Sequence, residues 1–173
     1  MSLIDQLTGQ TIGAIGRASN MLCIPIGRTV GRTRNGWDLT KYEIHCQCAW
    51  RLVDPEQKIL VASTDFYIPD SNNCWSNSFQ WDINGVNLFD EKIKQFNEFH
   101  KNTIIKSAVI AKCNDIIIEL EDATVFEAFT DSSVEENWRI IQRSPISVHL
   151  VSFGNQIRVD TEPNRNTEDG TVC

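Results

Sequence analysis

Apolar and polar residues alternate along residues 42–53. The apolar positions of this stretch are Tyr42, Ile44, Cys46, Cys48, Trp50 and Leu52. A repeat of two places successive side chains on opposite faces, so the stretch predicts one long strand with a single buried face. Residues 59–68 repeat the alternation, and Asp54-Pro55-Glu56 between them has the composition of a turn. The two stretches together predict a β-hairpin.

The polar positions of this hairpin supply the candidate site. They are Glu43, His45, Gln47, Arg51, Asp65 and Tyr67. If paired residue numbers sum to about 112, His45 lies opposite Tyr67 and Gln47 opposite Asp65, within reach for acid–base work or for holding a polar ligand. The alternative is a solvated outer face of an antiparallel sheet, which is polar as a rule.

The remaining patterns predict further strands and two helices. Helical spacing over 88–99, with Asn87 or Asp90 as cap, predicts the main helix near 88–100. We also expect a strand pair at 11–15 and 20–26, a meander at 104–113, 116–120 and 124–129, a short helix near 133–141, and a last hairpin at 146–153 and 157–159. The fold class is therefore α+β, mainly antiparallel, arranged as a meander or as a half-open barrel or sandwich.

The domain organisation follows from length and polarity. A chain of 173 residues suits one domain, which we assign to residues 1–159. Residues 160–173 are polar and predict a disordered tail. Residues 69–85 predict a long ordered loop whose role the sequence does not specify.

Charge is acidic overall and uneven along the chain. Sixteen Lys and Arg against 23 Asp and Glu give −7, and the pI is near 4.9, which argues against a nucleic-acid binder. Residues 17–41 contain five basic residues and one acid, and the Gly-rich part, 27–36, predicts a solvated basic loop. Residues 115–136 contain acids without Lys or Arg: Asp115, Glu119, Glu121, Asp122, Glu127, Asp131, Glu135 and Glu136.

Cysteine usage and hydropathy indicate the compartment. The first thirty residues have neither a basic start with a long apolar segment nor an apolar stretch of membrane-spanning length, so we expect a soluble cytoplasmic protein with reduced thiols. The spacing of Cys46-Gln47-Cys48 is too short for the usual zinc pair. Both thiols fall on the apolar side of the alternation, so we expect core packing, with no metal and no cofactor.

Two patches resemble a family. Residues 42–52 (YEIHCQCAWRL) and 131–139 (DSSVEENWR) are similar to small bacterial cytosolic proteins of an uncharacterised family. The resemblance implies a bacterial cytosolic protein and brings no activity or catalytic residue with it.

Two functions remain open at this stage. The first is a non-enzymatic binding protein, most concretely an immunity or antitoxin-like protein whose acidic segment neutralises a basic toxin; that segment equally suits a second copy of the chain, or simple solubility. The second is an enzyme or small-ligand protein that uses His45, Arg51, Asp65 and Tyr67. The absence of a catalytic motif favours the first.

Overall fold

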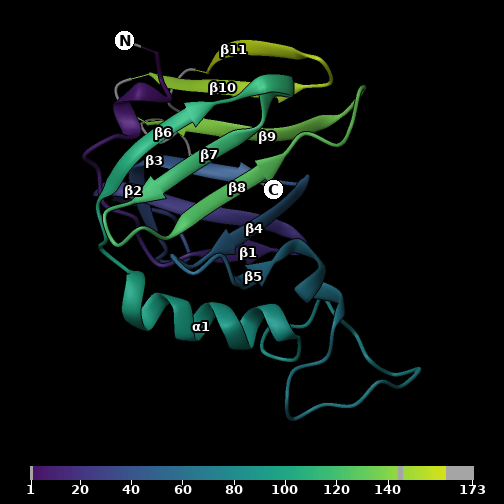
Figure 1. Cartoon of the computed structure of the whole chain (residues 1–173). Helices are drawn as coiled ribbons and strands as arrows, with labels where there is room; N and C mark the ends of the chain where they lie inside the picture. The colour runs from purple at the N-terminus through teal and green to yellow at the C-terminus, as the bar shows by residue number, and fades with distance from the viewer. Residues whose placement is uncertain (1, 144–145, 163–173) are drawn as a thin grey trace.

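Two antiparallel sheets enclose one core in the computed structural model, which describes residues 2–143 and 146–162 (Figure 1). The six-stranded sheet contains, in spatial order, β1 (Gly16–Ala18), β2 (Met21–Arg32), β3 (Asp38–Cys46), β9 (Glu136–Gln142), β10 (Ser147–Phe153) and β11 (Gln156–Glu162). The five-stranded sheet contains β5 (Ile59–Ala62), β4 (Ala49–Val53), β8 (Val125–Phe129), β7 (Ile116–Leu120) and β6 (Ile105–Ile110). The α+β class and the antiparallel sheets are as predicted.

The core lies between the sheets because each sheet presents one apolar face inward. Ile24, Ile44 and Ile140 form one row across the six-stranded sheet, and Leu52 and Phe126 lie opposite each other on the five-stranded sheet. All five side chains are buried in the same cluster. Trp138 of β9 is fully buried, and its indole N–H donates to the carbonyl oxygen of Asn114 at 2.7 Å, which ties the sheets together.

The chain crosses between the sheets at Gln47 and Cys48, which corrects the predicted long strand. The backbone N–H groups of Gln47 and Cys48 both donate to the carbonyl oxygen of Asn137, at 2.9 and 3.1 Å. Here β3 leaves the six-stranded sheet and β4 enters the other. The alternation continues through the crossing because the even positions face the shared core on both sides of it.

The predicted hairpin is therefore partly wrong. Strands β4 and β5 do pair, but Arg51 lies opposite Ala62 rather than Val61. Beyond Ala62 the chain forms the 3₁₀ helix η2 (Ser63–Tyr67), so His45 does not face Tyr67 and Gln47 does not face Asp65. In η2 the Asp65 carboxylate accepts the backbone N–H of Ala62 at 2.9 Å, which ends the strand at that point.

Helix α1 (Leu88–His100) confirms the predicted main helix. The Asn87 side chain accepts the backbone N–H of Asp90 and caps the first turn. Phe89 and Phe96 are buried in the shared core. The Asn97 side chain exchanges hydrogen bonds with the backbone of Ile15, which precedes β1. The helix also packs against β5 and η2. Helix α1 therefore closes the side of the sandwich between the edge strands β1 and β5 (Figure 1).

Other predicted elements have mixed outcomes. The meander is confirmed as β6, β7 and β8, and the last hairpin as β10 and β11. The short helix near 133–141 is wrong: Glu136–Gln142 is β9, a central strand between β3 and β10. A strand is favoured there because Trp138 and Ile140 are buried on one face of the sheet and Ile141 on the other.

Three boundaries also change. The basic segment 27–36 is not a loop, because β2 and β3 extend into a hairpin with a turn between Arg32 and Asp38. Residues 11–15 contribute isolated bridges at Thr11 and Ile12 instead of a strand. Strand β11 continues to Glu162, past the predicted boundary at 159; the rest of the predicted tail, 163–173, lies outside the described residues. Short 3₁₀ turns, η1 (Asp5–Leu7) and η3 (Lys112–Asn114), complete the elements.

No helix in the described part of the chain is both long enough and apolar enough to span a bilayer.

Candidate functional site

The predicted polar cluster is divided among several places. Glu43 and His45 lie on β3 of the six-stranded sheet, whereas Arg51 lies on β4 of the other sheet and bonds Glu127. Buried Asp65 in η2 binds the Lys92 ammonium at 3.0 Å. The sequence prediction failed because it placed all six residues on one hairpin face, and the chain changes sheets in the middle of them.

Gln47 and Tyr67 both line a surface hollow of about 180 Å³, together with Asn20 and Asp131. The Asn20 amide donates to the Tyr67 hydroxyl at 3.2 Å. The Gln47 side chain is exposed and contacts the Met21 sulfur. This hollow holds two of the six predicted residues and does not include His45.

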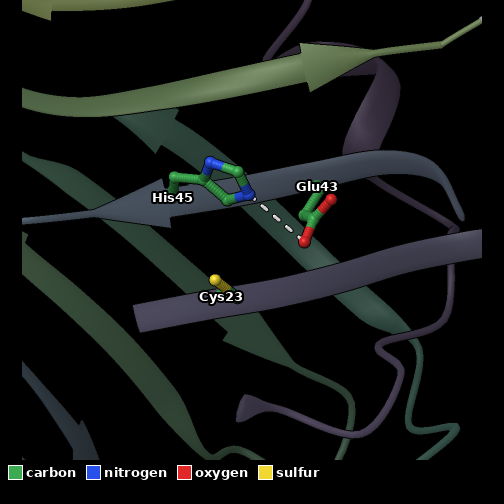
Figure 2. A group of neighbouring side chains, drawn as sticks. All are labelled: Cys23, Glu43 and His45. Atoms are coloured by element: carbon green, nitrogen blue, oxygen red, sulfur yellow. Dashed lines mark ion pairs between the residues drawn. The ribbon is translucent and has the colours of Figure 1, made fainter. Parts of the chain in front are cut away.

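Glu43 and His45 belong to a cluster that also includes Cys23. Cys23 of β2 lies directly opposite His45, and Glu43 is two positions along β3 on the same outward face. The donor atoms of the three side chains all lie within 4.8 Å of one another, and His45 Nε2 is 3.2 Å from Glu43 Oε1 (Figure 2). Figure 2 shows the imidazole and the carboxylate turned toward each other, with the Cys23 sulfur on the neighbouring strand.

The second carboxylate oxygen of Glu43 is held by an arginine. Arg143 Nη2 donates to Glu43 Oε2 at 2.5 Å, and Arg143 Nη1 donates to the carbonyl oxygen of Thr40. Glu43 and Arg143 are only 17% and 16% exposed, so the pair is shielded from much of the solvent. The Glu43 carboxylate therefore keeps one orientation, with Oε1 toward His45.

Burial and charge oppose each other in setting the pKa of Glu43, whereas burial and the Glu43 charge act together on the pKa of Cys23. Burial raises the pKa of the Glu43 carboxyl, but the hydrogen bond from His45 and the charge of Arg143 outweigh it, and the pKa lies below its usual value. Burial, followed by the charge of Glu43, raises the pKa of the Cys23 thiol to about 12. Without a bound cation, this thiol is protonated at neutral pH.

A second polar group adjoins the cluster on the same face. Arg139, which lies opposite His45 on β9, makes two hydrogen bonds of 2.6 Å to Glu136 and lies 3.0 Å from the Nδ1 atom of His149. The Ser147 hydroxyl lies 2.9 Å from the Nε2 atom of His149. The outer face of the six-stranded sheet thus carries a band of polar side chains on β2, β3, β9 and β10, which also borders the buried apolar residues Ile141 and Val151.

Sequence reasoning missed Cys23, Arg139 and Arg143 as members of this group. The available signal was the alternation of strand positions: Leu22, Ile24 and Ile26 are the apolar positions, and Cys23 lies between them, on the polar side of its strand. Alternation indicates which face a residue lies on but not which strands are neighbours, so it did not predict that β2 and β9 lie beside β3.

Cys46 and Cys48 are buried among core residues, in agreement with the predicted packing role. Their sulfur atoms are 3.4 Å apart. The hydrogen bond with Cys48, together with burial, raises the pKa of the Cys46 thiol well above its usual value. The burial of both thiols and the raised pKa of Cys46 suit an apolar packing role.

The carboxylates of the acidic segment, residues 115–136, have different surroundings. Four of its carboxylates pair with basic side chains of the chain itself within the described residues: Glu119 with Lys106, Asp122 with His100, Glu127 with Arg51, and Glu136 with Arg139. Asp115 and Asp131 accept backbone N–H groups from Thr130 and Ala49. Glu121 and Glu135 are exposed.

The outer face of the five-stranded sheet differs from the polar band. No layer of the described chain covers it in Figure 1, and Ile59, Val109 and Ile117 on this face are 54%, 48% and 37% exposed. A shallow depression of about 480 Å³ lies at one end, with Arg51, Val53, Pro55, Ile59 and Val125 in its lining. We call this outer surface of β4–β8 the open face.

Comparison of the chain with models of protein families, with curated proteins and with solved structures found no match. The function is therefore argued from the site geometry alone.

Proposed function

We propose that this protein works by binding another protein, and that the open face receives a basic partner. The observation that carries the proposal is the set of exposed apolar side chains on this face. Val109, Ile117 and Ile59 lie on β6, β7 and β5 and project from the same side of one sheet. Apolar side chains grouped on a regular surface and bordered by charges are typical of protein interaction sites.

The charge around the open face favours a basic partner. Because Val53 pairs with Val125, the β4–β5 and β7–β8 turns lie at the same end of the sheet. These turns contribute Asp54, Glu56, Glu121 and Asp122, against Lys58, which is already paired with Glu56. A negative rim beside exposed apolar side chains increases the association rate of a positively charged partner and orients it.

The most concrete form of this proposal is an immunity or antitoxin-like role. A toxin that cleaves nucleic acid needs a basic surface that binds the phosphate backbone. A single-domain acidic inhibitor is able to cover that surface. The alternative enzyme site lacks such support, since its four residues, His45, Arg51, Asp65 and Tyr67, are divided between two sheets and a 3₁₀ helix.

The experiment is affinity capture from cells of the source organism, followed by binding measurements with the purified partner. Ile117→Ser and Glu121→Lys each remove one feature of the open face without touching the core. We expect each variant to weaken binding about tenfold, or about 1.4 kcal/mol. Binding should also weaken as salt is raised, because the rim is exposed.

Val159→Ser and Glu135→Lys are the matched controls. Val159 is 65% exposed on β11 of the other sheet, and Glu135 is an exposed acid of the same acidic segment. Both should leave the affinity unchanged. A partner whose binding is unaffected by the open-face variants, or a captured partner with an acidic surface, would refute the proposal.

A further inference from the structure

We infer that Cys23, Glu43 and His45 form a binding site for one zinc-type divalent cation. The proposal concerns the six-stranded sheet and does not depend on the open face. Among the residues that the structure describes, this is the one group of three Cys, His or acidic side chains whose ligand atoms lie close enough to share an ion. A thiolate, an imidazole and a carboxylate are the three ligand types that Zn²⁺ uses in proteins.

The geometry needs small side-chain movements only. Zinc bonds of about 2.0–2.3 Å place the donors of a tetrahedral site about 3.3–3.8 Å apart. His45 Nε2 and Glu43 Oε1 already lie 3.2 Å apart, and all three donor atoms lie within 4.8 Å. Rotation of the Cys23 side chain toward β3 would complete the triangle, since its backbone is held opposite His45 by the β2–β3 pairing.

The strands also provide a rigid frame. Cys23 and His45 are cross-strand partners one pair from the end of the β2–β3 ladder, where β1 borders β2 and β9 borders β3. Ligands on neighbouring strands lose little freedom when they bind an ion, because the backbone is already ordered. All three side chains are half-buried, so the site is shielded but reachable from solvent.

Arg143 suits a supporting role around such an ion. It binds Glu43 Oε2 and leaves Oε1 for the cation, which is the usual arrangement of an outer group that orients a ligating carboxylate. One thiolate and one carboxylate balance the charge of a divalent ion, so Arg143 keeps its favourable contact with the Glu43 carboxylate. Three protein ligands leave a fourth position for water or for a donor from another molecule.

The test is zinc titration of the purified protein against a competing chromogenic chelator, with Co²⁺ as a spectroscopic probe. We expect one equivalent of zinc per chain and, for Co²⁺, a near-ultraviolet charge-transfer absorption that reports a thiolate ligand. Cys23→Ser and His45→Gln should each lower the zinc affinity about a hundredfold or more, since loss of a ligand costs at least as much as loss of an outer-shell group.

Cys74→Ser and Cys113→Ser are matched controls, because both thiols are exposed and remote from the cluster in the sequence. Neither should change the stoichiometry or the cobalt absorption. Far-ultraviolet circular dichroism of every variant checks the fold. The proposal is overturned if the folded wild-type chain binds no stoichiometric zinc, if Cys23→Ser binds zinc as tightly as wild type, or if bound Co²⁺ lacks the thiolate absorption.

Discussion

The outer faces of the two sheets come from the same kind of alternating sequence and differ in how their side chains meet solvent. On the six-stranded sheet, Glu43 and Arg143 are paired at 17% and 16% exposure, and Cys23 and His45 lie beside them. On the five-stranded sheet, Arg51 is 42% exposed in its pair with Glu127, and the neighbouring Ile59 is 54% exposed.

The difference arises from the neighbours that each strand acquires. Where polar positions of β2, β3, β9 and β10 come together, each charged group gains several partners and withdraws from water. Where apolar and charged positions mix, as on β4 to β8, isolated ion pairs form and apolar surface remains exposed. The first face is therefore suited to hold a small charged group, and the second to contact another protein.

The largest expected contrast between the faces is in the two glutamates. Glu43→Ala leaves Arg143 shielded and without its carboxylate partner, so we expect the free energy of unfolding to fall by about 2–3 kcal/mol. Glu127→Ala removes the partner of a more exposed arginine and should cost less than about 1 kcal/mol. Urea unfolding, followed by tryptophan fluorescence with a metal chelator present, measures both. Equal losses would show that the two pairs are equally solvated and would remove the contrast.

The pH dependence of stability sharpens the same contrast. The pKa of the Glu43 carboxyl is lower in the folded protein than its ordinary value of 4.5. A lowered folded pKa means that the ionised carboxylate stabilises the fold above the unfolded pKa, and that this contribution is lost as the pH falls through the folded value.

The stability difference between wild type and Glu43→Gln should therefore be present above the ordinary value of 4.5 and shrink as the pH falls below it. Urea titrations at a series of pH values, with chelator present, test this expectation. A difference that persists unchanged well below that value, or that shrinks near neutral pH, would contradict the assignment to Glu43.

The smallest expected effect on stability belongs to the open face. Ile117 is 37% exposed and projects away from the core, so Ile117→Ser should change the free energy of unfolding by no more than about 0.5 kcal/mol. Ile118→Ser, at the next position and 2% exposed, is the matched comparison and should be far more costly. A large loss for Ile117→Ser would mean that this side chain supports the fold rather than an interface.

Local patterns predicted a good part of this fold. The helix Leu88–His100 followed from helical spacing and the Asn87 cap, and the β6–β8 meander followed from short apolar runs separated by turn residues. These elements are defined by interactions between residues close in sequence, which a pattern records directly. The segment 133–141 was misassigned to a helix because it contains cap-like serines and acids, while pairing with β3 and β10 decides its structure.

The sequence by itself determined the α+β class, the main helix and which side of each strand faces the core, because alternation and capping are local. Only the tertiary structure decided that residues 42–53 divide between two sheets, since the turn at Gln47 and Cys48 depends on the distant carbonyl of Asn137. That one crossing separates His45 from Arg51, and the pairing of β2 with β3 places His45 opposite Cys23. The candidate cation site and the open face are thus consequences of strand pairing, which alternation alone does not encode.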